Sequence, residues 1–581
     1  MQDTQAFNPI VNPQGKMPVG ISNFAQLVQG DYCFVDKSLF IKEILDAGDG
    51  VSLITRPRRF GKTINLNMLC CFLQQPAGEK EDLFDGLAIS QQGTQYQRER
   101  GKRPVLFISL RTVKESNWDS AYIRMQSLLS KLAEEKSRDA PVNKLAETQQ
   151  MTLQRVIRKQ ATPTESKEIL AILTELLTLK HNGVTPWVCI DEYDAPMQSA
   201  YQYGYYKEMR NLMKGLLGDC LKDSPFLHRA VLTGILRVAK EDIFSDLNNP
   251  GIFGVLNHRF SSRFGFTKAQ TQALLASRGL TESLQHEVRC WYDGYCFGHE
   301  TIYNPWSVIN YLANPDDQVQ LYWVNTSTNH LVHKLLTRAD ATVKQGLHEL
   351  LSEAAHYSTT QTVREHVPLR EVENDSKNLW GLLLASGYLT AVQAKEDSNS
   401  DNKIVQLRIP NNEVRRVYSS LIEHWLQGAQ GINGASLLDA LVSGQLQEFI
   451  EGFQEFVLES ASFFDTGGKQ PERFYHAFVL GMLQHLRDRY IIDSEQISGM
   501  GRYDLALEPK DKTAPGFVFE FKRALQADDS LQASAAKALQ QIQDKQYHVS
   551  LMKRGAQTII ALGFAFQGKK VAIAHTTLDG A

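Results

Sequence analysis

The sequence predicts an α/β protein in which two α/β regions flank a mainly helical one, and three observations along its 581 residues support this arrangement. Short apolar strands alternate with helical patterns from about residue 50 to 265. Helical patterns then dominate to about residue 430, where a stretch rich in Gly, Ala and Ser marks a boundary. Strands and helices return after it. We therefore expect three domains, over residues 1–265, 266–432 and 433–581.

The composition is that of a soluble globular protein, with 43% hydrophobic and 22% charged residues. The formal net charge of -3 excludes a globally basic protein, so any nucleic-acid surface must be a local patch. No stretch approaches the roughly 18–20 apolar residues that cross a bilayer, and the first residues do not resemble a signal peptide. Scattered cysteines without a CxxC pair indicate reduced thiols, so we expect a cytoplasmic protein without membrane contact.

Four apolar runs in the first region have the length and residue types of buried strands. Each is rich in β-branched or aromatic residues and is apolar on both faces. Segments of 3.6-residue periodicity, such as 120–135, lie between them. Two-faced apolar strands that alternate with helices indicate a parallel sheet covered by helices. The runs are residues 51–55, 104–110, 186–191 and 229–235.

A phosphate-binding loop is indicated where Gly61, Lys62 and Thr63 follow the first of these strands and open a helix. Backbone N–H groups and the helix N-terminus would face an anion. Lys62 would reach the β- and γ-phosphates of ATP, and the Thr63 hydroxyl would bind Mg²⁺. The general GxxxxGK[ST] pattern places Gly at position 56, where this chain has Arg56. We count two further loop arginines among the nucleotide-binding candidates, Arg58 and Arg59.

Two acids end the strand at 186–191 and support the same interpretation. Burying Asp191 and Glu192 there costs free energy unless a cation or a reaction requires them. Asp191 would hold Mg²⁺ through water, and Glu192 would polarise the attacking water. A solvated turn is the alternative. On a later strand, Thr233 could sense the γ-phosphate and Arg237 could add positive charge, although Arg237 could instead pair with a surface acid.

In the middle region, a helical stretch at 379–390, a charged turn at 395–403 and a strand pattern at 404–411 outline a winged helix. The wing of such a motif could touch DNA. Because many helical domains carry a single hairpin, a simple spacer between the two α/β regions is the alternative reading of this stretch.

A strand at 516–522 carries the second candidate site. With a strand period of two, three phenylalanines point into a core while Glu520 and Lys522 project side by side from the other face. Pairing with a preceding short strand would bring Asp504 beside Glu520. These two carboxylates would hold Mg²⁺, with Mn²⁺ as an alternative ion, and the metal would activate water for phosphodiester hydrolysis. Lys522 would orient that water or stabilise the developing charge.

Further candidates lie on a predicted helix that precedes this strand. Glu472 would shape the site or help to hold a second ion. His476 lies on the same helical face four residues later and could contact phosphate, although a structural hydrogen bond explains it as well. Taken alone, an acid-x-Lys pattern on a strand is often only a solvated face.

Motifs along nearly the whole chain resemble those of the bacterial AAA-ATPase-like family whose members carry a C-terminal PD-(D/E)XK nuclease domain. In that family RPRRFGKT is the usual loop, so Arg56 does not count against nucleotide binding. The resemblance implies a P-loop NTPase sheet and a restriction-endonuclease-like α/β domain with an intact metal site. It also assigns Gln541 and Lys545, one helical turn apart, to a distal helix motif that could touch the substrate backbone, with an exposed polar stripe as the alternative. The matching segments include VGISNF (19–24), FVDKS (34–38), TRPRRFGKT (55–63), IDEYDAP (190–196), LTGILRV (232–238), YNPWSV (303–308), GRYD (501–504), EFK (520–522) and ALQQIQDKQY (538–547).

Together these patterns predict an ATP-binding, ATP-regulated and Mg²⁺-dependent nuclease that hydrolyses phosphodiester bonds in DNA, in defence against foreign DNA or in DNA processing. Two alternatives stay open. A nucleotide-driven switch could assemble with a partner and only grip nucleic acid through the nuclease-like domain. An active nuclease could instead cleave RNA, because the metal chemistry acts on the phosphate. A homo-oligomer is expected by analogy alone, since P-loop sites often lie at subunit interfaces.

Overall fold

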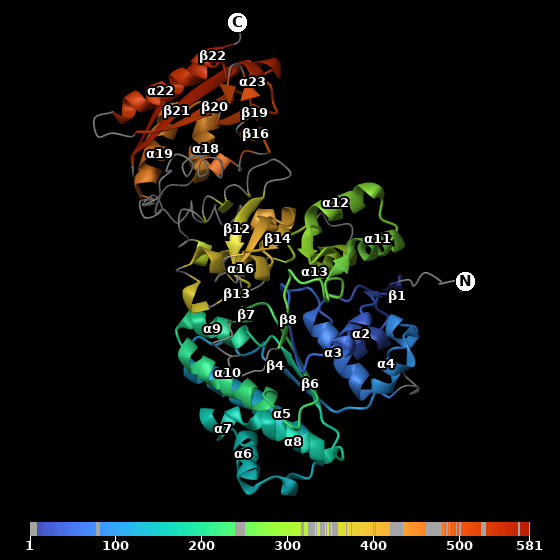
Figure 1. Cartoon of the computed structure of the whole chain (residues 1–581). Helices are drawn as coiled ribbons and strands as arrows, with labels where there is room; N and C mark the ends of the chain where they lie inside the picture. The colour runs from blue at the N-terminus through green and yellow to red at the C-terminus, as the bar shows by residue number, and fades with distance from the viewer. Residues whose placement is uncertain are drawn as a thin grey trace. The chain divides into compact units, whose positions relative to one another are not determined.

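The computed structural model divides the chain into two compact units (Figure 1). The first unit comprises residues 1–331 and 360–413, and the second comprises residues 332–359 and 414–581. The three-domain division expected from the sequence stays a prediction. No described helix is both long enough and apolar enough to cross a membrane. The structure describes residues 9–76, 82–238, 250–314, 319–323, 358–367, 369–372, 375–398, 400, 402–418, 434–459, 488–494, 497–498, 501–502, 504–524, 530–567 and 570–579, with scattered positions within 332–350 and 479–486.

A five-stranded parallel sheet forms the centre of the first unit, in the order β4-β5-β6-β3-β8. The α/β prediction is confirmed, because four of these strands are the expected ones. The edge strand β8 (Gly251–Phe253) pairs with β3, and it is too short for its pattern to be recognised in the sequence. The four expected strands are β3 (Val51–Thr55), β4 (Val105–Ser109), β5 (Trp187–Asp191) and β6 (Arg229–Gly234).

Helices cover both faces of this sheet. Figure 1 shows α3 (Lys62–Gln74) on one side and α5 (Trp118–Ser137), α8 (Ile169–Lys180) and α10 (Tyr206–Leu221) on the other. α3 begins directly after Gly61, whose φ of 84° lies in the left-handed region that favours glycine. Shorter helices of this unit are α2 (Leu39–Asp46), α4 (Thr94–Glu99), α6 (Glu147–Ile157), α7 (Pro163–Lys167) and α9 (Ala195–Tyr203).

The segment before the sheet packs against the helix that follows β3. The short strand β1 (Ile10–Val11) pairs antiparallel with β2 (Phe34–Val35), and α1 (Phe24–Gln29) lies between them in the sequence. The Phe24 N–H group donates to the Asn67 side-chain oxygen of α3 at 2.6 Å. The N-terminal segment is therefore attached directly to the helix that follows the predicted phosphate loop.

The part of the first unit beyond residue 265 contains the expected helices and two small sheets. The helix α16 (Ser376–Ser386) precedes β14 and β15, which pair antiparallel, as the winged-helix outline predicts. A third strand, β12, pairs with β15, and a separate sheet has the order β10-β11-β9. The other bounds are α11 (Lys268–Ser277), α12 (Glu282–Tyr292), α13 (Pro305–Ala313), β9 (Phe266–Thr267), β10 (Tyr295–Phe297), β11 (Glu300–Tyr303), β12 (Thr359–Val363), β14 (Thr390–Glu396) and β15 (Lys403–Arg408).

The second unit is a mixed sheet between two layers of helices. Its strand order is β16-β19-β20-β21-β22, and only β20 and β21 run parallel. Phe517, Phe519 and Phe521 join the core that α18 and α19 cover, whereas Val518 joins the core beneath α22, so the strand period predicted for β20 is confirmed. The bounds are β16 (Tyr490–Ser494), β19 (Leu505–Pro509), β20 (Gly516–Arg523), β21 (Thr558–Gln567), β22 (Lys570–Asp579), α18 (Gly434–Val442), α19 (Leu446–Glu459), α22 (Leu531–Asp544) and α23 (Val549–Lys553).

One glycine allows α22 to approach this sheet closely. Gly563 on β21 pairs with Glu520 on β20. A Cβ atom at position 563 would lie 2.4 Å from the Leu539 backbone nitrogen and 2.5 Å from the Ala535 carbonyl oxygen, and both of these residues belong to α22. The absence of a side chain at position 563 therefore lets α22 lie close to β21, next to the strand β20 that carries Glu520.

Replacing Gly563 with alanine should push α22 away from β21 and destabilise their contact by about 1–3 kcal/mol, the usual cost of overpacking. Hydrogen exchange of the β21 and α22 amides, measured by mass spectrometry on the full chain, should become roughly 5- to 150-fold faster. Gly516→Ala is the matched control, because its nearest neighbour, the Leu507 carbonyl oxygen, would lie at an ordinary 3.4 Å. Equal exchange in the two variants would contradict the close approach.

Candidate functional site

Lys62 makes hydrogen bonds within the predicted phosphate loop. Its buried amine donates to the carbonyl oxygens of Arg56 at 2.9 Å and Pro57 at 2.8 Å. Burial lowers the pKa of Lys62 to about 8, and the negative charges of Glu192 and Asp191 offset part of this effect. The Lys62 amine is thus held by neutral acceptors of the loop itself.

Asp191, at the end of β5, connects this strand with β6 and with the first turn of α3. Its fully buried carboxylate accepts from the Thr63 hydroxyl at 2.8 Å and from the Thr233 hydroxyl at 2.7 Å. β3, β6 and β5 are adjacent and parallel, so their carboxyl ends meet at one edge of the sheet. The structure therefore brings together Thr63 and Asp191, the two predicted Mg²⁺ ligands, and directs Thr233 at the same carboxylate.

Glu192 turns away from the strand that precedes it. Its φ of 49° is left-handed, which is uncommon for a residue other than glycine and recurs at functional sites. The carboxylate lines the cavity beside the loop, 3.6 Å from the Lys114 amine. Lys114 was not singled out by sequence reasoning, because an isolated lysine in a loop carries no recognisable pattern.

Arg56, at the position of the usual glycine, faces the protein interior. Its fully buried guanidinium donates to the carbonyl oxygens of Thr55 at 2.8 Å and Phe253 at 2.9 Å. It also lies over the rings of Phe264 and Phe297, with its central carbon 5.3 Å and 5.2 Å from the ring centres. Burial lowers its pKa to about 9. Arg56 thus supports the loop from the protein interior, which explains why an arginine can stand at this position of a phosphate loop.

The other predicted arginines lie in two different places. Arg58 and Arg59 line the cavity beside the loop, and the Arg59 guanidinium lies 3.9 Å above the Trp306 ring. Arg237 lies on β7 (Arg237–Val238), which pairs with β13 (His366–Val367). It lines a separate, smaller cavity, so the structure does not bring Arg237 into the cavity beside the phosphate loop.

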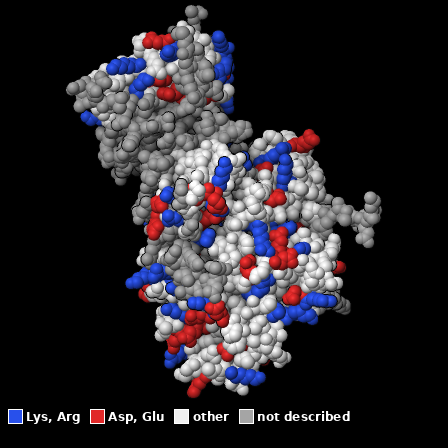
Figure 2. All heavy atoms as spheres, viewed as in Figure 1, with Lys and Arg blue, Asp and Glu red and all other residues white. Residues whose placement is uncertain are grey.

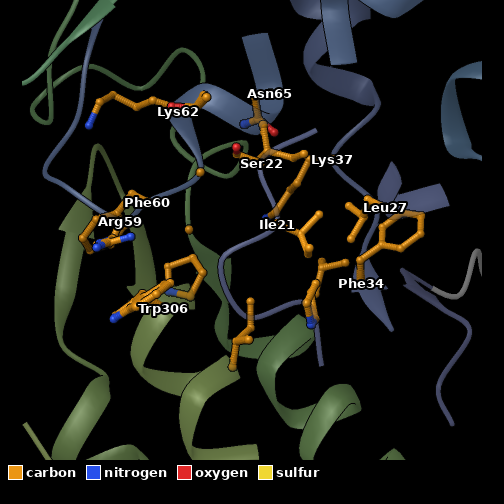
Figure 3. Close-up of a pocket in the computed structure, with 18 of the residues that line it drawn as sticks. Ile21, Ser22, Leu27, Phe34, Lys37, Arg59, Phe60, Lys62, Asn65 and Trp306 are labelled. Atoms are coloured by element: carbon orange, nitrogen blue, oxygen red, sulfur yellow. The ribbon is translucent and has the colours of Figure 1, made fainter. Parts of the chain in front are cut away.

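This cavity has a volume of about 470 Å³ and extends well beyond the loop (Figure 3). Its charged end contains loop residues 58–63 with Glu192 and Lys114. The rest of the lining comes mainly from the N-terminal segment, from β2 and the residues after it, from α13, and from Arg263. It includes Met17, Pro18, Gly20, Ile21, Ser22, Phe24, Phe34, Val35, Asp36, Lys37, Pro305, Trp306 and Ile309. A volume of this size is typical of a small-molecule site.

The second site brings Asp504, Glu520 and Lys522 together. β19 pairs antiparallel with β20, with Leu505 opposite Phe519, so Asp504 falls at the level of Glu520. The Asp504 carboxylate accepts from the Phe521 N–H group at 2.8 Å. Glu520 is buried, and the Lys522 amine lies 3.7 Å from its carboxylate. The three residues occupy the arrangement that strand geometry predicts.

α22 contributes Gln541 to this cluster. The Gln541 side-chain amide donates to the Glu520 carboxylate and, at 3.2 Å, to the Tyr547 hydroxyl oxygen. Burial raises the pKa of Tyr547, and the charges of Glu520 and Asp504 act in the same direction. Gln541 therefore orients a candidate metal ligand, while Lys545 is exposed at the end of the helix.

Two predicted members of this site, Glu472 and His476, lie outside the described residues. Within the described part of the chain, no group of three or more His, Cys, Asp or Glu side chains is arranged to hold a metal ion. Mg²⁺ is commonly held by one or two carboxylates and several waters. Asp504 and Glu520 supply two carboxylates at one place, so the residues present fit this ion.

Comparison with known proteins gives matches in both regions. A family model described as a predicted AAA-ATPase (AAA-ATPase-like) matches residues 18–244, and a PD-(D/E)XK nuclease superfamily model matches residues 470–576. A protein of Azotobacter chroococcum mcd 1, described as an uncharacterized protein in the vnfD 5′ region, is 26% identical over 561 residues, which are 95% of this chain and 96% of that protein. Among solved structures, the Walker-type ATPase PabY2304 of Pyrococcus abyssi is 15% identical with a TM-score of 0.34, over 66% of this chain and 95% of that one. A TM-score this low does not establish a shared fold.

Each family match encloses one of the two clusters. Lys62, Thr63 and Asp191 lie within the first match, and Asp504 and Glu520 lie within the second. The chain thus joins an AAA-ATPase-like domain at residues 18–244 to a C-terminal domain of the PD-(D/E)XK nuclease superfamily at residues 470–576.

Proposed function

We propose that this protein is an ATP-regulated, Mg²⁺-dependent nuclease that hydrolyses phosphodiester bonds in DNA. The observation that carries the proposal is the convergence of Asp504, Glu520 and Lys522 at one place on the sheet of the second unit. The hydrogen bond from Thr63 to Asp191 supports the ATP-binding half. We propose DNA processing or defence against foreign DNA as the role of this activity.

In the nuclease half, Asp504 and Glu520 would hold a Mg²⁺ ion, which lowers the pKa of a bound water and neutralises phosphate charge. The Lys522 side chain is 36% exposed, so its amine can reach from Glu520 to a substrate phosphate and stabilise the charge that develops there. Gln541 keeps the Glu520 carboxylate in one orientation. We further propose Glu472 as an additional ligand, with His476 and Lys545 as contacts to the nucleic-acid backbone.

In the ATPase half, Lys62 would exchange the carbonyls of Arg56 and Pro57 for the β- and γ-phosphate oxygens of ATP. Thr63 and Asp191 would hold the Mg²⁺ that accompanies the nucleotide. The side chain of Glu192 lines the cavity, where it can orient a water for attack on the γ-phosphate. Thr233 would respond to nucleotide through its hydrogen bond to Asp191, whereas a phosphate contact by Arg237 would require its strand to move.

A nucleotide-driven switch is a second candidate function, and the contacts of the loop favour it. The Trp323 side-chain N–H donates to the Arg58 carbonyl oxygen at 3.4 Å, and Trp306 lies against Arg59. Because these tryptophans contact the loop directly, a change in the partners of Lys62 would alter their surroundings. Under this hypothesis ATP drives assembly into an oligomer, and the nuclease-like domain grips nucleic acid without cleaving it.

The described surface offers no single basic face for a nucleic acid in the view of Figure 2, where basic and acidic side chains are interspersed. Phosphate contacts of Lys522 would weaken with salt. RNA is the alternative substrate, because the proposed metal chemistry acts on the phosphate and does not read the sugar.

Lys522→Ala should lower the rate of DNA cleavage by about 100-fold or more, the usual loss when a group that stabilises the developing charge is removed. The assay uses single-stranded, duplex and branched DNA and RNA, with Mg²⁺ or Mn²⁺, with and without ATP. Lys512→Ala is the matched control, because Lys512 also pairs with a glutamate, Glu508, at 2.8 Å in the same unit. If Lys522→Ala cleaves as fast as Lys512→Ala, or if the wild type cleaves nothing, the nuclease proposal fails.

Gln541→Leu should raise the Mg²⁺ concentration that gives half-maximal cleavage by about 10- to 100-fold, because the Glu520 carboxylate loses the amide that orients it. Its neighbour Gln540, which bonds to Asp544 at 2.8 Å, provides the control Gln540→Leu. A metal titration of cleavage measures both variants. An unchanged midpoint in Gln541→Leu, together with normal folding, would show that the amide does not act through the metal ligand.

ATP affinity should fall as the pH rises above about 8, by up to tenfold per pH unit, because binding then requires protonation of Lys62. Below that pH the lysine is already charged in the nucleotide-free protein, so the affinity should not change for this reason. Titration calorimetry in buffers of different ionisation enthalpy should detect proton uptake on ATP binding near pH 8.5. Affinity that is constant from pH 7 to pH 9.5 would contradict the role of Lys62.

A further inference from the structure

Residues from far along the chain lie against the phosphate loop. The Trp323 side-chain N–H donates to the Arg58 carbonyl oxygen at 3.4 Å. A Cβ atom at Gly387, the residue that ends α16, would lie 2.8 Å from the Pro57 ring and 3.5 Å from the Trp323 ring. Tyr388 packs edge-on against the same tryptophan, with the ring centres 5.1 Å apart. Two loop residues, Pro57 and Arg58, are therefore packed against the end of α16 and Trp323.

A buried carboxylate fixes the position of Trp323. Glu413 is fully buried, and its two oxygens accept from the Trp323 backbone N–H group at 2.7 Å and from the Ser307 hydroxyl at 2.8 Å. Ser307 lies on α13 beside Trp306, whose ring contacts Arg59. Burial raises the pKa of Glu413 to about 7, and these two donors offset part of that effect. Because a carboxyl group is costly to bury, we infer that its hydrogen bonds to Trp323 and α13 serve a purpose.

The residues just before Glu413 are fixed as well. The Asn411 side-chain amide donates to the Asp293 carbonyl oxygen at 2.9 Å. A Cβ atom at Gly294 would collide with the Pro410 carbonyl oxygen, so the two segments approach closely. Glu413 is therefore held in place within the first unit by its own hydrogen bonds and by those of the turn that precedes it.

Glu413 also stands where the chain leaves the first unit. It is the last residue of that unit, and the segment that begins at Val414 belongs to the second unit. The chain is helical from residue 412 to residue 418, so Glu413 and Val414 belong to one helical stretch. A shift of Glu413 would therefore move the beginning of the segment that enters the second unit.

The partners of Lys62 connect these contacts to the nucleotide. Its amine binds two loop carbonyls, one of them from Pro57. When phosphate oxygens replace these carbonyls, the loop loses a charged donor and residues 56–58 can change position. Because the Arg58 carbonyl accepts from the Trp323 side chain, that change would reach Trp323 and, through its backbone N–H group, Glu413.

We propose that Glu413 is a positioning residue that couples the nucleotide state of the phosphate loop, through Trp323, to the chain segment that enters the second unit. The inference rests on the proposed ATP site at Lys62 and names the route by which ATP regulates the second unit. It also gives the segment 303–308, which is outside both acidic clusters, a role through Ser307 and Trp306. Such a coupling typically changes an equilibrium about 5- to 150-fold.

Hydrogen exchange of amides 411–418, measured by mass spectrometry on the full-length protein with and without saturating Mg²⁺–ATP, tests the coupling. In the wild type ATP should slow this exchange about 5- to 150-fold, because the nucleotide fixes the loop and with it Trp323 and Glu413. Trp323→Phe removes the side-chain N–H that binds Arg58 but keeps the backbone N–H that binds Glu413, so most of the ATP effect should disappear. Trp380→Phe is the matched control, because Trp380 is also buried in the first unit, on α16, and should leave the ATP effect unchanged.

Substitutions of Glu413 provide a second test with the same measurement. Glu413→Gln keeps an acceptor for the Trp323 N–H group and a partner for the Ser307 hydroxyl, so ATP should slow the exchange as in the wild type. Glu413→Ala removes both partners, so the ATP effect should be lost while calorimetry still detects ATP binding. Loss of the effect in Glu413→Gln, or its retention in Glu413→Ala, would contradict the role of this carboxyl group.

The outcomes separate this inference from the proposed function. If the wild type binds ATP in titration calorimetry but amides 411–418 exchange equally with and without it, the coupling is wrong while the phosphate site stands. The same holds if Trp323→Phe responds to ATP like Trp380→Phe. If the wild type does not bind ATP, the phosphate site itself is wrong and the coupling falls with it. The measurement needs no DNA cleavage, so the nuclease half can fail independently, and the wild-type comparison decides the matter even if a variant does not fold.

Discussion

A buried carboxylate requires hydrogen-bond donors, and in this protein side-chain donors hold Asp191 at the end of β5 and Glu520 within β20. In the first unit Asp191 on β5 accepts from two threonine hydroxyls, one on β6 and one in the first turn of α3. In the second unit Gln541 donates to Glu520, and the Phe521 backbone donates to Asp504. These donors fix the positions of the acids.

The phosphate loop has Arg56 where the general pattern has glycine, and the fold accommodates this arginine. Arg56 turns inward to backbone carbonyls and aromatic rings, which leaves the outer face of the loop to Arg58, Arg59 and Lys62. The Lys62 amine donates its hydrogen bonds to carbonyl oxygens of the same loop. A buried amine held by neutral acceptors is less stable in its charged form than one held by phosphate, so an anion is a favourable partner for Lys62.

Much of this organisation follows from sequence patterns, and the remainder depends on contacts between distant segments. The strands around Lys62 and Asp191 and the alternating faces of β20 are predictable, because apolar runs and a period of two are local signals. The pairing of Gln541 with Glu520 is not, since it depends on the close approach at Gly563. The cavity beside the loop could likewise not be predicted from the sequence, because residues near position 20 and α13 meet only in the folded chain.

The proposed activity depends above all on a divalent-metal site formed by Asp504 and Glu520. The most direct measurement is anomalous X-ray diffraction from crystals of the full-length protein grown with Mn²⁺. We expect an anomalous peak within about 2.0–2.3 Å of oxygens from both carboxylates, the range for such ions. A peak bound elsewhere, with none between Asp504 and Glu520 at saturating Mn²⁺, would contradict it.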